Sequence, residues 1–340
     1  LFKVGQIYNE RDVRESERNI RSLRQESFAL IQPLEGSHPD RVKMLVVVKD
    51  IWSLRLNSDY RIQDGLEYLL LQPSEENLAG IHRRLSGLFI YEPDTITAGA
   101  RFVDPRLNGS RLAWIADANV VVNHATGDVE GSNGFVSYGL PLWSTRREWA
   151  CNVTAQWDKA IDRTFVGRSQ AFLDVLETPD DTSDDIPFIV DSEIIAGRST
   201  VTRSFGYRHK SDVTVGLLAS RSVSRPPDLS GFDPEAAAAY VRDIVPPSQV
   251  NNGAQITYHY YQNRFASLVD VETMSLQESF LLGPELYLRW GAFPRFLAST
   301  RNLLQFRVTA AYTQRLGDGV VRPFASYGID NHVESDDIRI

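Results

Sequence analysis

Residues that could act in acid–base, nucleophilic or metal chemistry are present, but they are not grouped in known patterns. The histidines occur singly, without metal-ligand spacing such as HExxH; they are His38, His82, His124, His209, His259 and His332. The sequence also lacks a GxSxG elbow, a phosphate-binding loop and a dinucleotide-binding glycine pattern. We therefore expect a protein that is not an enzyme and that carries no cofactor. A site assembled from residues of distant strands is the enzymatic alternative.

One acidic run comprises Asp180, Asp181, Asp184 and Asp185. Clustered carboxylates suit a hard cation such as Ca²⁺, but this run lacks the spaced glycine of an EF-hand loop. Acidic surface loops are common, so we interpret the run as a solvated loop and expect no metal site.

Long alternating segments are the strongest structural pattern. Apolar and polar residues alternate almost without error from Arg111 to Asn123, from Glu148 to Asp158 and from Asn302 to Arg315. A period of two indicates a β-strand. These segments are about a dozen residues long, roughly twice the usual strand length of about 5–6. Repeated long strands with two different faces are typical of a transmembrane antiparallel β-barrel with a lipid face and a wet lumen.

Four charged residues lie on the polar sides of these segments: Asp117, Asp158, Arg307 and Arg315. In a barrel the polar side faces the lumen. We therefore expect these charges to line the interior. Ion pairs between such residues, for example between Arg307 and Asp117, would hold the shape of the barrel.

The chain divides into two regions. Residues 1–51 resemble a small α+β module, with a helix that starts after the N-cap Asn9 and ends near Gln25. Strands at 28–32 and 41–48 follow. Residues 52–340 read as about thirteen strands, at 53–62, 65–72, 82–91, 95–103, 111–123, 130–140, 147–158, 199–210, 212–223, 253–264, 278–291, 301–315 and 319–331. The long connections are 159–198 and 224–252, and the second contains a helix from Asp233 to Val245.

Charge and hydropathy exclude two classes of protein. The net charge is −8, so the chain lacks the basic stripe of a nucleic-acid-binding protein. No apolar run reaches the roughly 18 residues of a transmembrane helix. The sequence therefore argues against a nucleic-acid partner and against a helical membrane protein.

Three motifs follow one another in the first third of the chain. The segment from Gly5 to Asn9 precedes the first helix, the turn Glu76-Asn77-Leu78-Ala79-Gly80 comes after the second long strand, and Asp104-Pro105 follows. Their order and spacing resemble the BamA-like bacterial surface-antigen superfamily. In that comparison the first motif resembles the second helix of a POTRA module. The residues that match the family's two turn motifs are Glu76, Asn77, Gly80, Asp104 and Pro105.

The resemblance implies an outer-membrane β-barrel of the Gram-negative type, preceded by a partial POTRA-type module in the periplasm. It implies insertion or translocation of polypeptides through a barrel with a lateral seam. In the candidate seam strand, 53–62, one face carries Arg55, Asn57, Asp59 and Arg61. The implied partners are outer-membrane lipids, unfolded or exported polypeptides, and periplasmic or lipoprotein subunits of an envelope complex. Family barrels usually have roughly sixteen strands, so we expect the barrel in this sequence to be truncated at its C-terminal end.

Two other functions remain open. The same fold could serve as a two-partner secretion pore or as the structural barrel of a larger envelope complex, because fold alone does not decide function. A soluble all-β binding protein is the third possibility. It would bury Trp114, Trp149 and Trp157 between two sheets.

Overall fold

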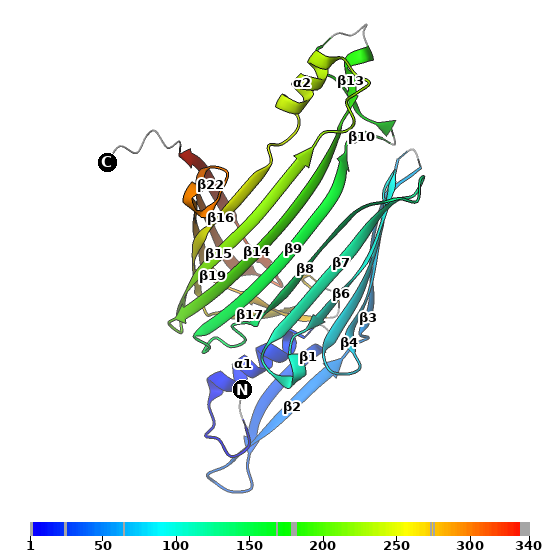
Figure 1. Cartoon of the computed structure of the whole chain (residues 1–340). Coiled ribbons are helices and arrows are strands. Elements are labelled where there is room, and N and C mark those ends of the chain that lie inside the picture. Colours follow the sequence, from blue (N-terminus) through cyan, green and yellow to red (C-terminus); the bar gives the residue numbers. More distant parts are fainter. Residues whose placement is uncertain are drawn as a thin grey trace, which may run out of the picture.

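The computed structural model describes residues 3–23, 26–63, 65–167, 169–177, 182–272, 274 and 276–333. Within them the chain is mainly β, and most strands belong to one large antiparallel sheet (Figure 1). In chain order the strands of this sheet are β3 (Leu54–Ile62), β4 (Leu66–Leu78), β5 (Arg83–Tyr91), β6 (Thr95–Asp104), β7 (Ala113–Asn123), β8 (Val129–Leu140), β9 (Trp149–Arg163), β14 (Ile189–Phe205), β15 (His209–Arg225), β16 (Gln249–Gln262), β19 (Gly283–Phe293), β20 (Asn302–Leu316), β21 (Gly319–Val321) and β22 (Phe324–Val333).

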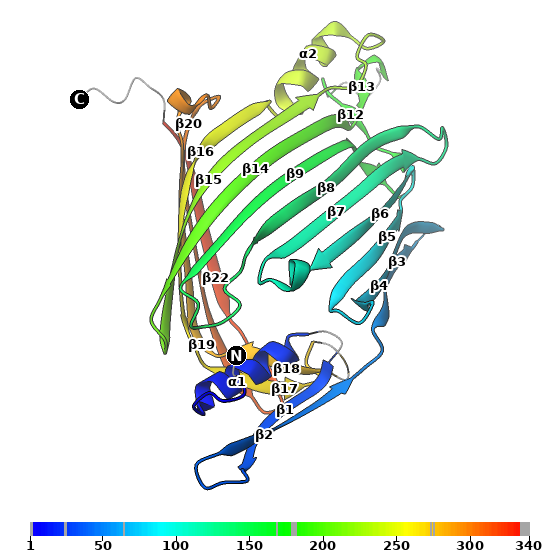
Figure 2. The same cartoon turned by 60° about the horizontal axis from the view of Figure 1, so that its bottom comes forward.

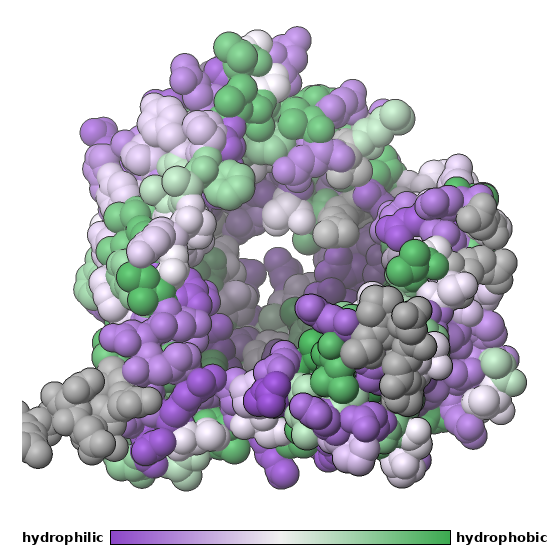
Figure 3. Space-filling model, turned by 90° about the horizontal axis from the view of Figure 1, so that it is seen from above, coloured by the Kyte–Doolittle hydropathy of each residue, from purple (hydrophilic) through white to green (hydrophobic). Residues whose placement is uncertain are grey.

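The sheet is an uninterrupted meander with two edges. Each strand pairs with the next one of the sheet in chain order, and both β21 and β22 pair with β20. β3 forms one edge and β22 the other, and no pairing among the described residues joins them. The wall of strands is strongly curved (Figure 2), and the space-filling view from above shows a central opening (Figure 3). The architecture is therefore barrel-like but not closed.

The two ends of the sheet carry different segments. At one end lie α1 (Glu10–Arg21), β1 (Glu26–Glu35) and β2 (Val42–Asp50), beside the hairpin β17 (Phe265–Val269) and β18 (Gln277–Leu281) (Figure 2). The opposite end carries α2 (Pro234–Asp243) and the short strands of a long connection (Figure 1). These strands are β10 (Phe165–Val166), β11 (Ser169–Gln170), β12 (Phe172–Asp174) and β13 (Asp185–Pro187). The 3₁₀ turns are η1 (Leu107–Gly109), η2 (Thr182–Asp184) and η3 (Arg295–Leu297).

Both helices begin where their capping residues predict. The side chain of Asn9 accepts a hydrogen bond from the Arg11 amide at 3.0 Å. Asp233 accepts from the amides of Glu235 and Ala236 at 2.8 and 3.1 Å, with Pro234 in the first turn of α2. Capping oxygens satisfy amides that have no partner inside the helix.

The most compact apolar core lies under α2 and not inside the large sheet. Ile186, Ala236 and Tyr240 are fully buried there. The Tyr240 hydroxyl accepts from the Ile189 amide at 3.1 Å and lies 2.8 Å from the Ile189 carbonyl oxygen. This core joins the two long connections into one ordered cap.

The strands of the large sheet follow the predicted order, but there are fourteen instead of about thirteen, because the segment predicted at 319–331 divides into β21 and β22. The short strands β10 to β13 and the strand β17 were not predicted. The other differences lie at turns. The hairpin predicted at 199–210 and 212–223 turns at Gly206, which has a φ of +78°. Its first strand, β14, begins at Ile189, ten residues before the predicted start. The predicted strand 278–291 is wrong as a single element. β18, which pairs with β17, ends at Leu281, and β19 of the large sheet begins at Gly283, which has a φ of +97°. A left-handed residue is tolerated best as glycine and interrupts a regular strand. The predicted end of the first helix, Gln25, lies outside the described residues.

Candidate functional site

The large sheet has an inverted distribution of polarity. Three of its buried residues are apolar, namely Val190, Phe293 and Leu303, whereas twelve are polar or charged. Large apolar side chains instead cover the other face, among them Leu217 at 65 % exposure. In a water-soluble protein the apolar residues would be the buried ones. The candidate functional surface is therefore the polar interior of the sheet, together with its two edges and its two ends.

A hydrogen-bonded network crosses the interior between β7 and β8. Asn119 is buried and donates to the carboxylate of Asp117 at 2.7 Å and to the amide oxygen of Asn133 at 2.8 Å. The antiparallel register places Asn119 opposite Asn133. Farther along the wall, the Arg198 guanidinium donates to Gln255 at 3.0 Å.

The other charges predicted for the lumen lie apart from one another. Arg307 pairs with Asp330 of β22 at 2.7 Å and not with Asp117, so the expected pair between Arg307 and Asp117 does not form. Asp158 lies in β9 opposite Asn133 and is exposed. Arg315 lies where β20 ends and is 3.9 Å from Asp318 in the following turn.

A histidine-centred cluster joins β16, β19 and the residues after β21. The ring of His259 stacks on Tyr287 with 3.8 Å between ring centroids, and its Nε2 is 3.0 Å from Glu285. Glu285 also pairs with Arg322 at 2.6 Å. In the sequence His259 is an isolated histidine, because its partners come from strand register and not from local spacing. The arrangement forms an ion-paired cross-link between strands.

The residues of the two turn motifs lie at the same end of neighbouring strands. Glu76 is at the end of β4, where it is 3.5 Å from Arg84, and the Asn77 side chain accepts from the His82 amide at 2.9 Å. Asp104 is almost completely buried at the end of β6 and pairs with Arg83 at 2.8 Å.

The adjacent arginines of β5 therefore connect the two motifs, which the sequence did not reveal. Gly80 forms the first turn at a φ of +70°, and Pro105 follows directly after β6. These contacts give both motifs a structural role in bracing this end of the wall.

The predicted seam strand is an edge of the sheet. β3, which contains Arg55, Asn57, Asp59 and Arg61, pairs with β4 along its whole length and has no second neighbour among the described strands. On its alternate positions, Leu54, Leu56 and Tyr60 are exposed. One row of backbone N–H and C=O groups of β3 is consequently free to pair with another strand.

Helix α1 is held across the end of the wall by polar contacts with turns. Glu15, which is 5 % exposed, accepts from the Thr145 amide in the β8–β9 turn. Asp12 pairs with Arg146 of the same turn at 2.6 Å. Lys210 of β15 donates to the Thr145 carbonyl oxygen at 2.8 Å, which holds the same turn against β15.

Helix α1 also contacts two aromatic rings, one in the turn between β14 and β15 and one at the start of β17. Arg11 lies 4.7 Å from the ring centroid of Tyr207, and Arg18 lies 4.3 Å from that of Phe265. The strand β1 extends the contact surface, because the Ala29 amide donates to Gln277 of β18 at 3.4 Å. The N-terminal segment and the sheet therefore meet at a continuous interface.

The structure offers no metal centre in its described part. No group of three or more His, Cys, Asp or Glu side chains there could hold a metal ion. Of the acidic run, Asp180 and Asp181 lie outside the described residues, while Asp184 is buried and accepts from the Leu176 amide at 3.3 Å. Neither described helix is long and apolar enough to cross a membrane.

Comparison with solved structures gives distant likenesses, one of them to a BamA protein. BamA from Haemophilus ducreyi lacking POTRA domains 1-3 matches 98 % of this chain and 77 % of its own, with 7 % sequence identity and a TM-score of 0.37. This likeness is too low to assign a family or a function. No known protein family matches the sequence. No curated protein matches it either.

Proposed function

We propose that the chain is an outer-membrane barrel protein that handles polypeptides. The observation that carries the membrane location is the inverted polarity of the sheet, with a polar interior and an apolar outer face. Burial of apolar surface is worth roughly 25 cal/mol per Å². An outer face that includes Leu217, Val215 and Ile195, all at least half exposed, is stable when lipid covers it. The same face in water is an aggregation hazard.

The polypeptide role is supported by the edges of the sheet. β3 and β22 each present backbone groups without a strand partner among the described residues. Unpaired backbone groups cost several kcal/mol each in lipid. An added strand at either edge would satisfy them by β-augmentation. A non-enzymatic role in insertion or translocation follows from this pairing.

Two substitutions in β15 test the membrane location. Leu217 lies at the middle of the strand on the apolar face, whereas Ser220 lies on the opposite, half-buried face. Leu217→Arg should cost about 2–4 kcal/mol in a bilayer and reduce the fraction of protein that is folded in outer membranes, as measured by the gel mobility of unheated against boiled samples. Ser220→Arg is the matched control and should leave this fraction unchanged. An unchanged folded fraction in Leu217→Arg, with the protein recovered in the soluble fraction, would refute the membrane location.

A reconstitution experiment tests the polypeptide role separately. The full chain in liposomes should accelerate insertion of an unfolded barrel-type polypeptide relative to protein-free liposomes. A synthetic peptide with the sequence of residues 324–333 should compete at the β3 edge and slow this insertion, whereas a scrambled peptide should not. Equal insertion rates with and without the chain would refute the polypeptide role and leave the membrane location standing.

A further inference from the structure

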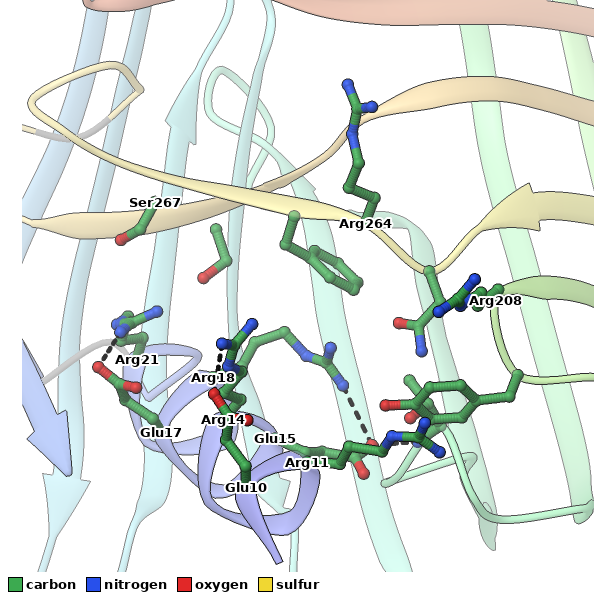
Figure 4. A pocket seen from close by; sticks show the side chains of 15 residues that line it. Glu10, Arg11, Arg14, Glu15, Glu17, Arg18, Arg21, Arg208, Arg264 and Ser267 are labelled. Carbon is green, nitrogen blue, oxygen red and sulfur yellow. Dashed lines mark hydrogen bonds and ion pairs between the residues drawn. The ribbon is translucent and has the colours of Figure 1, made fainter. Parts of the chain in front are cut away.

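A cleft of about 590 Å³ lies between α1 and the turns at the end of the sheet (Figure 4). Six arginines and three glutamates line it, whereas the chain as a whole carries a net charge of −8. The arginines are Arg11, Arg14, Arg18, Arg21, Arg208 and Arg264. Positive charge is thus concentrated at this end of an otherwise acidic protein.

The glutamates neutralise only half of these arginines. Glu10 pairs with Arg14 at 2.5 Å, and Glu15 pairs with Arg18 at 3.1 Å. Glu17 pairs with Arg21. The remaining three arginines of the cleft are Arg11, Arg208 and Arg264. They have no carboxylate partner among the described residues, and all three are exposed. The cleft therefore keeps an excess of positive charge that a ligand can meet.

The geometry favours a ligand with several anionic groups. The three arginines without a carboxylate partner come from three separate segments: Arg11 from α1, Arg208 from the turn between β14 and β15, and Arg264 from the residues between β16 and β17. A ligand with several anionic groups can meet charges from more than one of these segments. The ring of Tyr207 stacks against Arg11, which orders that guanidinium while leaving its N–H edges free to donate. Arginine binds planar carboxylates through two parallel hydrogen bonds.

The lining argues against a lipid. None of the residues that line the cleft is aliphatic, so nothing there would accommodate an acyl chain. The side chains are arginine, glutamate, serine, threonine and asparagine, with two aromatic rings. An extended peptide suits these polar walls, because its backbone pairs with hydroxyl and amide groups while its acidic side chains meet the arginines.

We infer that this cleft binds an extended polypeptide segment that carries several aspartate or glutamate side chains. The inference deepens the proposed polypeptide role, and it rests on that role for the choice of a polypeptide over other polyanions. It assigns the first contact of such a segment to α1 and the neighbouring turns, and not to the β3 edge.

Fluorescence anisotropy on the purified full chain in detergent tests the inference. The probe is a labelled peptide of about ten residues in which glutamate and serine alternate, and its control replaces each glutamate by glutamine. We expect the acidic peptide to bind at least about tenfold tighter than the control and to weaken as salt is added. Arg11→Glu/Arg208→Glu should weaken binding of the acidic peptide at least about tenfold. Arg242→Glu is the matched control, because Arg242 is exposed on α2 at the opposite end, and it should leave affinity unchanged.

Three results would overturn the inference. They are equal binding of the acidic and glutamine peptides, unchanged affinity in the Arg11→Glu/Arg208→Glu protein, and tighter binding of inorganic polyphosphate or anionic lipid vesicles than of the peptide. The test is independent of the gel-mobility and insertion assays. Failure of peptide binding in a protein that passes both assays removes this site and leaves the proposed function intact.

Discussion

Replacement of Glu15 by alanine should release α1 from the end of the sheet. The Glu15 carboxylate is buried and accepts from the Thr145 amide and from Arg18. A hydrogen bond to a charged group contributes about 1.5–3 kcal/mol, and the loss leaves a buried amide without a partner. Alanine returns only a few tenths of a kcal/mol through its higher helix propensity. The net loss of about 1.2–2.7 kcal/mol should therefore raise the opening equilibrium of the helix by a factor of about 8–100.

Native-state hydrogen exchange of the α1 amides in the full chain measures this opening. Glu10→Ala is the matched control, because Glu10 lies on the same helix and its pair with Arg14 is largely exposed. An exposed pair at i,i+4 contributes about 0.3–0.5 kcal/mol, so exchange should change by less than about threefold. Equal exchange in the two variants would refute the conclusion that Glu15 anchors the helix.

Three further predictions concern other buried polar groups. Asp104→Ala should lower the temperature at which unheated protein converts to the boiled gel mobility, because it removes the charge-assisted hydrogen bond to Arg83, which contributes about 1.5–3 kcal/mol. Burial beside Asp50 raises the pKa of Glu26 from 4.5 to about 7. The protonated Glu26 carboxyl therefore contributes fully to the stability of the β1–β2 hairpin below pH 4.5, and this contribution is lost as the pH rises through about 7. NMR titration of the Glu26 carboxyl should give this raised pKa. In the parent protein the urea concentration at half-unfolding of the hairpin should fall between mildly acidic and mildly alkaline pH, and Glu26→Gln should remove this fall. Tyr240→Phe should make the α2 cap more sensitive to protease, at a cost of about 1–3 kcal/mol, because the Ile189 amide loses its acceptor.

Most strands of the large sheet could be placed from the sequence because their residues alternate between two faces. The segment that became β7 needs no distant information, since Trp114 and Asp117 already fall on opposite faces. Turn positions were less predictable. Gly206 and Gly283 fix a hairpin and a strand break through backbone conformation, and glycine occurs elsewhere in these strands without such an effect.

The candidate site was far less accessible to sequence reasoning than the fold. Arg307 lies on the polar side of its strand, but the choice of Asp330 as its partner depends on the register of β20 with β22. The cleft beside α1 depends on residues from distant parts of the chain, such as Arg11 and Arg208, that come together only when the helix docks. Local spacing shows which residues share a face, whereas tertiary docking decides which charges remain unpaired.

The N-terminal segment joins two parts of the wall that are distant along the sheet. α1 is anchored to the turns that follow β8 and β14 and to the start of β17, while β2 leads into the edge strand β3 through a three-residue link, residues 51–53. Such a link spans at most about 14 Å, so the end of β2 stays close to the start of β3. β1 pairs with β2 over its whole length and packs against α1. The docked helix α1 is thus connected to the β3 edge through β1, β2 and a short link, so the N-terminal segment sets where this edge begins.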